Sequence, residues 1–400
     1  MSAPLRVAHV GPVATSTPPP RSGSVETMTS LLTEGLVARG HEVTFLCTNR
    51  IDRREALYAD TVERVTEDGI RVVYLRTTTI PWWPGSFGPH YVHGLRARLD
   101  RELAQHDVAH LHEYRSALAG GLGAAARRQG IPYVLQPQGT LRPGERNQRL
   151  KWLYDRWIGQ SLLDGAGCLI AATAREQKLF SDSGVELQRT EVVPNGLELL
   201  RFDPLPERGR FRDRWGIPPD LQMVLFVGRL DLTKGPDLLV DAFCRLDDPR
   251  AVLVLIGPDH GLADKIREMV TEAGREDSVV LTGPLPEDHE VLEALVDSDI
   301  FVQPSRFEAF GMSILEACAA SRPLLLSQAC QNSDAFKDRA ALVVPCTIAG
   351  LADGLRKLLD DEGMRTRYGA EAHAILEEEY TLPTVAAQLE AIYENLMGTQ

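Results

Sequence analysis

The chain has 400 residues, of which 44% are hydrophobic and 25% charged, as in an ordinary globular protein of two or three domains. Its 43 Lys and Arg against 56 Asp and Glu leave a net charge of −13, which argues against a nucleic-acid binder, because such proteins carry a basic footprint. No apolar run is long enough to span a membrane, no signal-peptide core is visible, and the six cysteines lack C-x-x-C spacing, so we expect a cytoplasmic protein with reduced cysteines.

The first half of the chain alternates short apolar runs with helical stretches. An amphipathic helix is predicted at 25–40, where Gly40 closes it. Buried strands are predicted at 6–13, 42–48, 70–76, 108–112 and 132–136. This strand–helix alternation predicts a doubly wound parallel sheet.

The second half repeats the alternation after a Pro/Asn/Gly-rich boundary near residue 200. Strands are predicted at 223–230, 251–257, 279–283, 300–305 and 323–327, and helices at 236–246, 263–274, 290–298, 310–320 and 381–398. The fold class is therefore α/β, with two Rossmann-like doubly wound domains. We expect them to face a central cleft, because such sheets bind ligands at the carboxyl ends of their strands.

The stretch "PSRFEAFGMSILEA" carries Glu308 and Glu316 eight positions apart in an otherwise apolar segment. If the segment is one helix, both glutamate side chains can point to the same side of it, about 12 Å apart along the axis. Phe310, Gly311 and Met312 would then form a first turn whose backbone N–H groups suit an anion. The alternative is that Glu308 merely caps the helix and Glu316 is solvated.

Two basic residues, Arg229 and Lys234, follow the strand in "FVGRLDLTKGPDLL" and precede a helix. Arg offers a planar fork for phosphate and Lys a mobile point charge. Taken alone they could be ordinary surface charges. Together with Glu308 and Glu316, on strand ends of the same domain, they indicate a ligand site.

Four segments together resemble glycosyltransferase family 4, the retaining enzymes with the two-Rossmann-domain (GT-B) fold. They are "RSGSVETMTSLLTEGLVARGHEVT", "VPNGLE", "FVGRLDLTKGPDLLVDAF" and "PSRFEAFGMSILEACA". The resemblance covers nearly the whole chain in order and spacing. It implies an acceptor domain at 1–198, a nucleotide-sugar-binding domain at 199–382, and a C-terminal helix at about 383–400 that packs back on the first domain.

The resemblance also implies roles for the site residues. Arg229 and Lys234 would clamp the donor diphosphate, and Glu308 with the backbone of Phe310, Gly311 and Met312 would hold the donor sugar and phosphate. Glu316 would accept a hydrogen bond from the ribose. Gly23 and Ser24 would match the glycine loop that meets the phosphate, and His112 and Gln138 would lie on the acceptor side.

The function expected from this resemblance is metal-independent, retaining transfer of a hexose from a UDP- or GDP-hexose to a hydroxyl of a saccharide, lipid or natural product, with no cofactor. The chain departs from the family pattern at one glycine of the loop before Ser24, at Gln138, where the family often has a histidine, and at "ACQNSDAF". Two alternatives stay open: a nucleotide-sugar-binding regulator that lost turnover, and an enzyme similar to the glycan phosphorylases.

Metal-ligating patterns are weak in this sequence. His110 and His112 share one face of a predicted strand, but no further ligands can be placed, and strand-end packing is the alternative. The "DSD" at 297–299 matches the D-x-D of metal-dependent transferases of another fold, at a helix end where chance explains it better. We therefore predict no metal site.

Two segments could contact partners. The stretch 141–160 carries five basic residues with Trp152 and Trp157, which suits weak peripheral contact with a membrane or an anionic acceptor. A solvated helix with a packed aromatic face is the preferred interpretation. The segment "IPWWPGSFGPH" at 80–90 could be an acceptor loop, since long loops often carry function.

Overall fold

The computed structural model describes residues 3–11, 24–49, 56–79, 90–92, 94–141 and 148–398. The chain forms two compact units, of which unit 1 comprises Met1–Gly196 with Leu382–Gln400 and unit 2 comprises Leu197–Thr381. The boundaries predicted from the sequence were 198/199 and 382/383. The six cysteines are free, as expected from their spacing.

Unit 1 contains an eight-stranded sheet in which every neighbouring pair is parallel except β3 and β4. Its strands, in spatial order, are β10 (Thr190–Val192), β9 (Cys168–Ala171), β8 (Tyr133–Gln136), β7 (Val108–His112), β1 (Arg6–Val10), β2 (Glu42–Thr48), β4 (Arg71–Leu75) and β3 (Val62–Val65). Two short strands, β5 (Thr77–Thr79) and β6 (His90–Val92), pair antiparallel outside it. The strand order reverses between β1 and β7.

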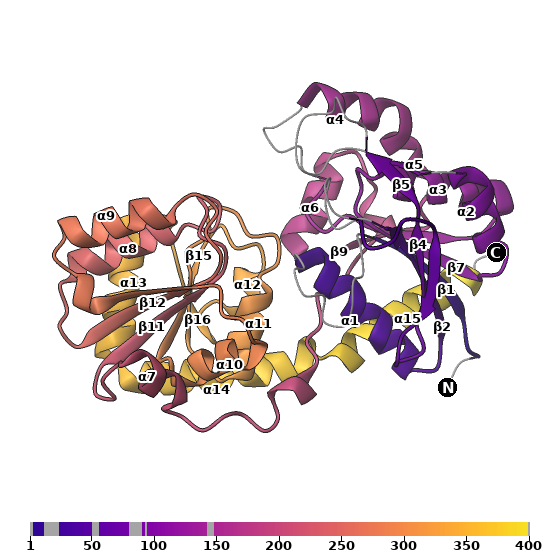
Figure 1. The fold of residues 1–400 in the computed structure, drawn as a ribbon. Coiled ribbons are helices and arrows are strands. Elements are labelled where there is room, and N and C mark those ends of the chain that lie inside the picture. The colour runs from indigo at the N-terminus through magenta and orange to yellow at the C-terminus, as the bar shows by residue number, and fades with distance from the viewer. Residues whose placement is uncertain are drawn as a thin grey trace. The chain divides into compact units, whose positions relative to one another are not determined.

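Helices cover both faces of this sheet (Figure 1). They are α1 (Ser24–Ala38), α2 (Leu95–Leu103), α3 (Ala117–Gln129), α4 (Gln148–Tyr154), a π-helical turn (Asp155–Gly159), α5 (Gln160–Gly165), α6 (Ala174–Asp182) and α15 (Leu382–Gly398), with a 3-10 turn at Leu187–Arg189. The side chains of α2, α3 and α5 build one apolar core. On the other face α15 lies along α1, where Gly35 leaves room for Leu382 and Ala386.

Unit 2 contains a six-stranded, fully parallel sheet. Its strands, in spatial order, are β13 (Val279–Gly283), β12 (Ala251–Ile256), β11 (Gln222–Val227), β14 (Ile300–Gln303), β15 (Leu324–Ser327) and β16 (Ala341–Val344). The central strands read as unbroken apolar runs because both faces are covered. The order reverses between β11 and β14, the point at which sheets of this kind bind ligands.

The helices of unit 2 form the two outer layers on its sheet. They are α7 (Arg210–Trp215), α8 (Pro236–Leu246), α9 (Ala263–Glu272), α10 (Asp288–Asp297), α11 (Met312–Ala319), α12 (Ser333–Phe336), α13 (Ile348–Asp360) and α14 (Glu362–Glu379), with 3-10 turns at Leu199–Phe202 and Glu276–Ser278. Helices α8, α9 and α13 gather on one side of the sheet, and α10, α11 and α14 on the other (Figure 1). The predicted two Rossmann-like sheets are confirmed.

The predictions for the segments 141–160 and 80–90 have different outcomes. The packed aromatic face expected at 141–160 is wrong, because Trp152 and Trp157 are 64% and 77% exposed. The predicted acceptor loop at 80–90 lies, apart from its last residue, outside the described residues. No helix in the described part of the chain combines the length and hydropathy needed to cross a bilayer.

Candidate active site

The loop after β11 is organised by Asp231. Its carboxylate pairs with Arg229, with Nε 3.0 Å from Oδ2, and accepts a hydrogen bond from the backbone N–H of Lys234 at 2.9 Å. The N–H of Gly235 donates to the Asp231 carbonyl at 3.2 Å. The loop therefore presents the two predicted cations from one tight turn, with the Arg229 side chain about half exposed.

Gly235 allows this loop to touch the loop after β14. Its φ is +71°, and a Cβ atom there would lie 2.4 Å from the carbonyl oxygen of Pro304. A side chain would thus meet both backbone strain and a clash with backbone. The close approach sets the distance between the two strand-end loops that flank the reversal of strand order.

Arg306 ties the same two loops together through its side chain. Its guanidinium forms a two-pronged ion pair with Asp237 on α8, at 2.7 and 2.8 Å, and also donates to the carbonyl of Leu232 at 2.7 Å. Burial acts to raise the pKa of Asp237, but the Arg306 hydrogen bond and charge outweigh it and the pKa is lowered. Asp237 is thus held as a carboxylate at the base of the site.

Lys234 and Glu308 meet across these two loops. The ammonium of Lys234 forms an ion pair with the Glu308 carboxylate, whose residue is only 7% exposed. Gln303, the last residue of β14, donates to the same carboxylate oxygen at 3.4 Å. The backbone of Glu308 is fixed as well, because its N–H donates to the Ala329 carbonyl and its own carbonyl accepts from Gln331.

Helix α11 begins later than the sequence suggested. Gly311 is its N-cap, with φ −81° and ψ 105°, and Met312 is its first residue. The prediction that Phe310 and Gly311 lie in the first turn is therefore wrong, and so is the placement of Glu308 and Glu316 along one helix. The cause is the bridge between Glu308 and Cys330, which keeps residue 308 extended.

The residues around the start of α11 differ in exposure. The ring of Phe310 is buried and lies 6.2 Å from that of Tyr380, between centroids, so this residue can offer only its backbone. The Ser313 hydroxyl donates to the Gln303 side chain at 3.2 Å, which links the helix to β14. Glu316 lies within α11 and is half-buried, and because Gly311 is the N-cap, Glu308 does not cap this helix.

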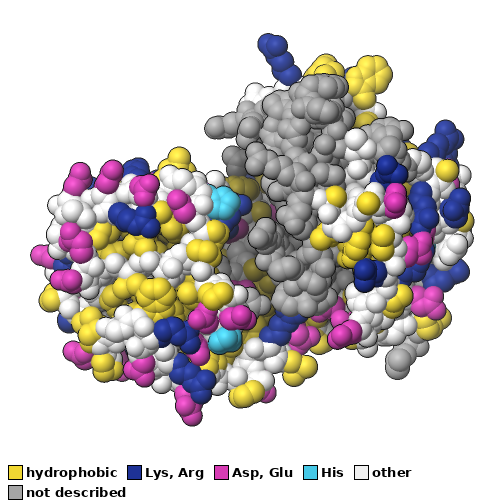
Figure 2. Space-filling model, viewed as in Figure 1, with side chains coloured by type: hydrophobic (Ala, Val, Ile, Leu, Met, Phe, Trp, Pro, Cys, Tyr) yellow, Lys and Arg dark blue, Asp and Glu magenta, His cyan; other side chains and the backbone are white. Residues whose placement is uncertain are grey.

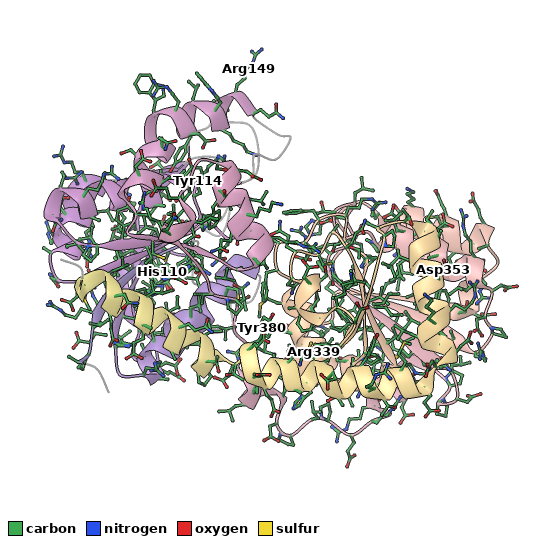
Figure 3. All side chains as sticks on the ribbon, turned by 180° about the vertical axis from the view of Figure 1, so that it is seen from behind. His110, Tyr114, Arg149, Arg339, Asp353 and Tyr380 are labelled. Carbon is green, nitrogen blue, oxygen red and sulfur yellow. The ribbon has the colours of Figure 1, made fainter. Side chains whose placement is uncertain are left out.

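In unit 1 three histidines stack at the reversal of strand order. His9 on β1 pairs in register with His110 on β7, and His112 follows on the same face. Their ring centroids are 4.1 to 5.1 Å apart and all three residues are fully buried. Figure 3 shows His110 beside α15, and its Nδ1 lies 2.6 Å from the hydroxyl of Tyr393 on that helix.

A hydrogen-bonded chain runs from these rings towards Gln138. His9 Nδ1 lies 2.9 Å from His112 Nε2, and His112 Nδ1 lies 3.1 Å from Nε2 of Gln138. Desolvation lowers the pKa of all three histidines, that of His110 to about 3, so the rings are neutral at pH 7. His112 is sealed inside the chain, while the half-buried Gln138 reaches its edge.

The turn that holds Gln138 is anchored by Glu176. Gln138 adopts a left-handed backbone conformation with φ +49°, and the next N–H, of Gly139, donates to Glu176 Oε1 at 2.5 Å. The other carboxylate oxygen accepts from the N–H of Ala172 at 2.7 Å. Burial raises the pKa of Glu176, outweighing these two hydrogen bonds.

The described residues contain one group with the composition of a metal site, the three histidines, whose candidate ligand atoms lie within 4.8 Å of one another. Their rings stack and bond to each other, to Gln138, and to Tyr393 and Gln136, rather than converging on a point. The D-x-D candidate has a structural role: Asp297 accepts from three backbone N–H groups around the start of α7.

The two residues predicted for the glycine loop, Gly23 and Ser24, cannot be placed relative to the other predicted site residues. Gly23 lies outside the described residues, and Ser24 is described only as the first residue of α1. Several residues that contact the predicted ones were missed: His9, Glu176, Asp231, Gln303 and Arg306. Gln303 could have been noticed as a polar residue ending the buried run "IFVQ", and Glu176 as the end of the capping sequence "TARE" after an apolar run.

Comparison with known proteins places both halves of the chain in one group of enzymes. Residues 23–196 match the family described as "Glycosyl transferase 4-like domain", and residues 207–374 match "Glycosyl transferases group 1". The D-inositol 3-phosphate glycosyltransferase of Xylanimonas cellulosilytica is 31% identical over 299 residues, 70% of each chain. That of Kineococcus radiotolerans is 30% identical over 77% of each chain.

Solved structures agree on the fold. Sucrose-phosphate synthase from Thermosynechococcus elongatus superposes with a TM-score of 0.75 at 21% identity, covering 99% of this chain and all of that one. The HepE protein of Anabaena, in complex with UDP-glucose, gives a TM-score of 0.74 at 16% identity, covering 98% of this chain and all of its own. The matched families, the relatives and the two parallel-sheet units together lead to one conclusion: the chain belongs to the group 1 glycosyltransferases, enzymes of the GT-B fold.

Proposed function

We propose that this chain is a retaining, metal-independent hexosyltransferase that uses a UDP- or GDP-hexose and a hydroxyl of a saccharide, lipid or natural product. The observation that carries the proposal is the Lys234–Glu308 ion pair, held beside the start of α11 where the strand order of unit 2 reverses. The HepE structures with UDP and UDP-glucose support a uridine donor.

The donor diphosphate would be held by Arg229, Lys234 and the backbone N–H groups at the start of α11. On binding, the Lys234 ammonium would contact phosphate while staying paired with Glu308, whose carboxylate would also accept hydrogen bonds from the sugar hydroxyls. Glu316 would accept from the ribose. Arg229, Lys234 and the helix N–H groups are positive where the leaving diphosphate gathers negative charge, and stabilising that charge is the main catalytic effect that such a site can supply.

The acceptor hydroxyl would attack the donor sugar on the face from which the diphosphate leaves. The described residues around Glu308 include no side chain placed as a nucleophile, because the Glu308 carboxylate is engaged by Lys234 and Gln303. Departing phosphate oxygen would take the proton of the incoming hydroxyl, and the new bond would form on the same side of the sugar. No cofactor or metal enters these steps.

Gln138 would contact the acceptor, and His112 would position the Gln138 side chain. His112 is fully buried and bonds to the Gln138 side chain, whereas Gln138 is half-buried. We assign Gly23 and Ser24 to the donor phosphate. Since the relatives carry the name D-inositol 3-phosphate glycosyltransferase, inositol 3-phosphate is the first acceptor to test.

The test is ligand-induced thermal stabilisation followed by transfer. We expect UDP, or failing that GDP, and their hexoses to raise the Tm of the wild-type protein, and Lys234→Met to abolish the shift. Nuclear magnetic resonance of the product should show the donor's anomeric configuration. Absence of stabilisation by every nucleoside diphosphate, or an inverted product, contradicts the proposal.

A further inference from the structure

An exposed apolar surface lies on the helical run from Gln148 to Gly165 of unit 1. Trp152 is 64% exposed and Trp157 77%, and Leu153 and Ile158 are exposed by 44% and 42%. Tryptophan is highly buried on average, and a cluster of exposed large apolar side chains marks an interaction site. Figure 2 shows hydrophobic and basic side chains side by side over α4. We call Trp152, Leu153 and Trp157 the tryptophan patch.

A π-turn follows Trp152 and Leu153 in the chain and contains Trp157. The N–H of Gln160 donates to the carbonyl of Asp155, five residues back, so this turn holds one residue more than an α-helical turn. Ile158, in the same turn, lies against α3, because a Cβ atom at Gly120 would be 2.8 Å from its Cγ2.

The opposite side of the run is fastened to the rest of unit 1. The Tyr154 hydroxyl lies 2.9 Å from the carbonyl of Tyr114 and 3.0 Å from that of Ser116. Gly159 packs so closely that a Cβ atom there would lie 2.1 Å from the Tyr114 hydroxyl. The helical run is therefore fixed to unit 1 through Tyr154 and Gly159, while Trp152 and Trp157 stay exposed.

Basic side chains flank the patch, although the chain as a whole carries a net charge of −13. Arg149 points away from α4 (Figure 3), and the guanidinium of Arg156 lies 5.9 Å from the ring centroid of Trp157. The nearby Asp155 is neutralised by a two-pronged ion pair with Arg115, at 2.7 and 2.9 Å. The charge next to the exposed indoles is thus positive.

We infer that the tryptophan patch docks unit 1 onto the surface of an anionic lipid bilayer. Indoles settle at the headgroup level of membranes, and arginines beside them bind lipid phosphates. A second copy of the chain is a poorer partner, because a symmetric interface would set the cations of one patch against those of the other. This inference does not depend on the proposed transfer reaction.

The test uses the full chain with phosphatidylcholine vesicles prepared with and without phosphatidylglycerol. We expect co-sedimentation with the anionic vesicles only, weakening as salt rises, and a blue shift of tryptophan emission on binding. Failure to bind anionic vesicles overturns the inference. So does equal binding to both kinds of vesicle.

Two double variants separate the contributions. Trp152→Ala with Trp157→Ala should weaken binding about tenfold or more, because both indoles lose their burial in the interface. Arg149→Glu with Arg156→Glu should weaken it about 30-fold or more. All four side chains are exposed, so the variants should fold normally.

Matched controls come from exposed residues elsewhere. Leu200→Ala with Leu232→Ala removes two side chains that are 78% and 58% exposed, and Arg267→Glu with Arg356→Glu reverses two exposed charges. We expect both controls to bind as wild type. Equal weakening of controls and patch variants contradicts a local docking surface, as does self-association in sedimentation velocity that the tryptophan variants abolish.

Discussion

The ammonium of Lys234 and the carboxylate of Glu308 form an ion pair between the loops after β11 and β14, the two strands at which the order of the second sheet reverses. Gln303 donates to the same carboxylate oxygen, and the Glu308 backbone is paired on both sides. A residue held this firmly can position a reacting sugar, because little motion remains to be lost when the donor binds.

Glu308→Gln should mainly lower kcat. The amide keeps the size of the side chain but loses the charge that Lys234 balances, so the sugar shifts; a displacement of about 1 Å can cost on the order of 100-fold in rate. Steady-state kinetics with saturating donor measures the effect. An unchanged kcat with a raised donor KM would contradict this role.

Glu316→Gln should mainly raise the donor KM. A ribose contact is similar in the ground and transition states, so its loss is uniform and leaves kcat less affected. A hydrogen bond to a charged acceptor contributes roughly 1.5–3 kcal/mol, which predicts a 10- to 100-fold fall in kcat/KM. A lowered kcat at unchanged KM would place Glu316 at the reacting bond instead.

Gly235→Ala should destabilise unit 2 by about 3 kcal/mol or more and impair donor binding. The alanine would combine a positive φ, which costs roughly 1–2 kcal/mol, with a contact of 2.4 Å to the Pro304 carbonyl. Gly274→Ala is the matched control, since Gly274 has φ +61° and a Cβ atom there would meet no described atom within 4 Å. Calorimetry should show a clearly larger loss for Gly235→Ala; equal losses would mean that the loop contact is unimportant.

Mild acid should destabilise unit 1. In the folded protein His9, His110 and His112 have lowered pKa values because they are desolvated, whereas in the unfolded chain they titrate near 6.5. Below that pH the unfolded chain binds more protons, so the free energy of unfolding falls as the pH drops towards the folded values, near 3 for His110. These three groups and His106 of the same unit, whose pKa burial also lowers, give a slope of up to about 5 kcal/mol per pH unit.

Hydrogen exchange of β1 and β7 between pH 7.5 and 5 measures this slope, after correction for intrinsic exchange. His9→Gln removes one of the four titrating groups and should reduce the slope by about a quarter, whatever the stability of the variant. His289→Gln, in unit 2 and away from the cluster in the sequence, should leave it unchanged. A wild-type slope in His9→Gln would show that the buried rings are not its source.

Transfer activity should survive EDTA. The proposed phosphate ligands are Arg229, Lys234 and helix amides, which need no bridging cation. The measurement is product formation with and without chelator, using manganese and magnesium for restoration. Activity lost in EDTA and restored by either ion would overturn metal independence.

Sequence patterns predicted the parallel sheets because period and composition are local properties. The strands Glu42–Thr48, Val108–His112 and Val279–Gly283 have the bounds expected from their apolar runs. The start of α11 could not be predicted, since Glu308 is kept extended by pairing with Cys330, a contact set by the tertiary fold. The ion pairs and hydrogen bonds of Asp231, Gln303 and Arg306 were missed, because the partner of a side chain cannot be read from the periodicity of the sequence.

The histidine cluster shows the other limit. Alternation placed His110 and His112 on one face, but their neighbours His9 and Tyr393 lie more than a hundred and more than two hundred residues away in the chain. The exposure of Trp152 and Trp157 was also unpredictable, because aromatic residues on a helix usually pack.

Helix α15 (Leu382–Gly398) makes unit 1 a discontinuous domain, because the whole of unit 2 lies in the sequence between this helix and the rest of unit 1. During translation, unit 2 is an uninterrupted segment that can close as soon as it leaves the ribosome. Unit 1 cannot be completed until α15 has been synthesised. Until then the surface that α15 covers is exposed to water, and His110 lacks its hydrogen-bond partner, the hydroxyl of Tyr393. Synthesis order therefore reverses the usual rule that the N-terminal domain is completed first.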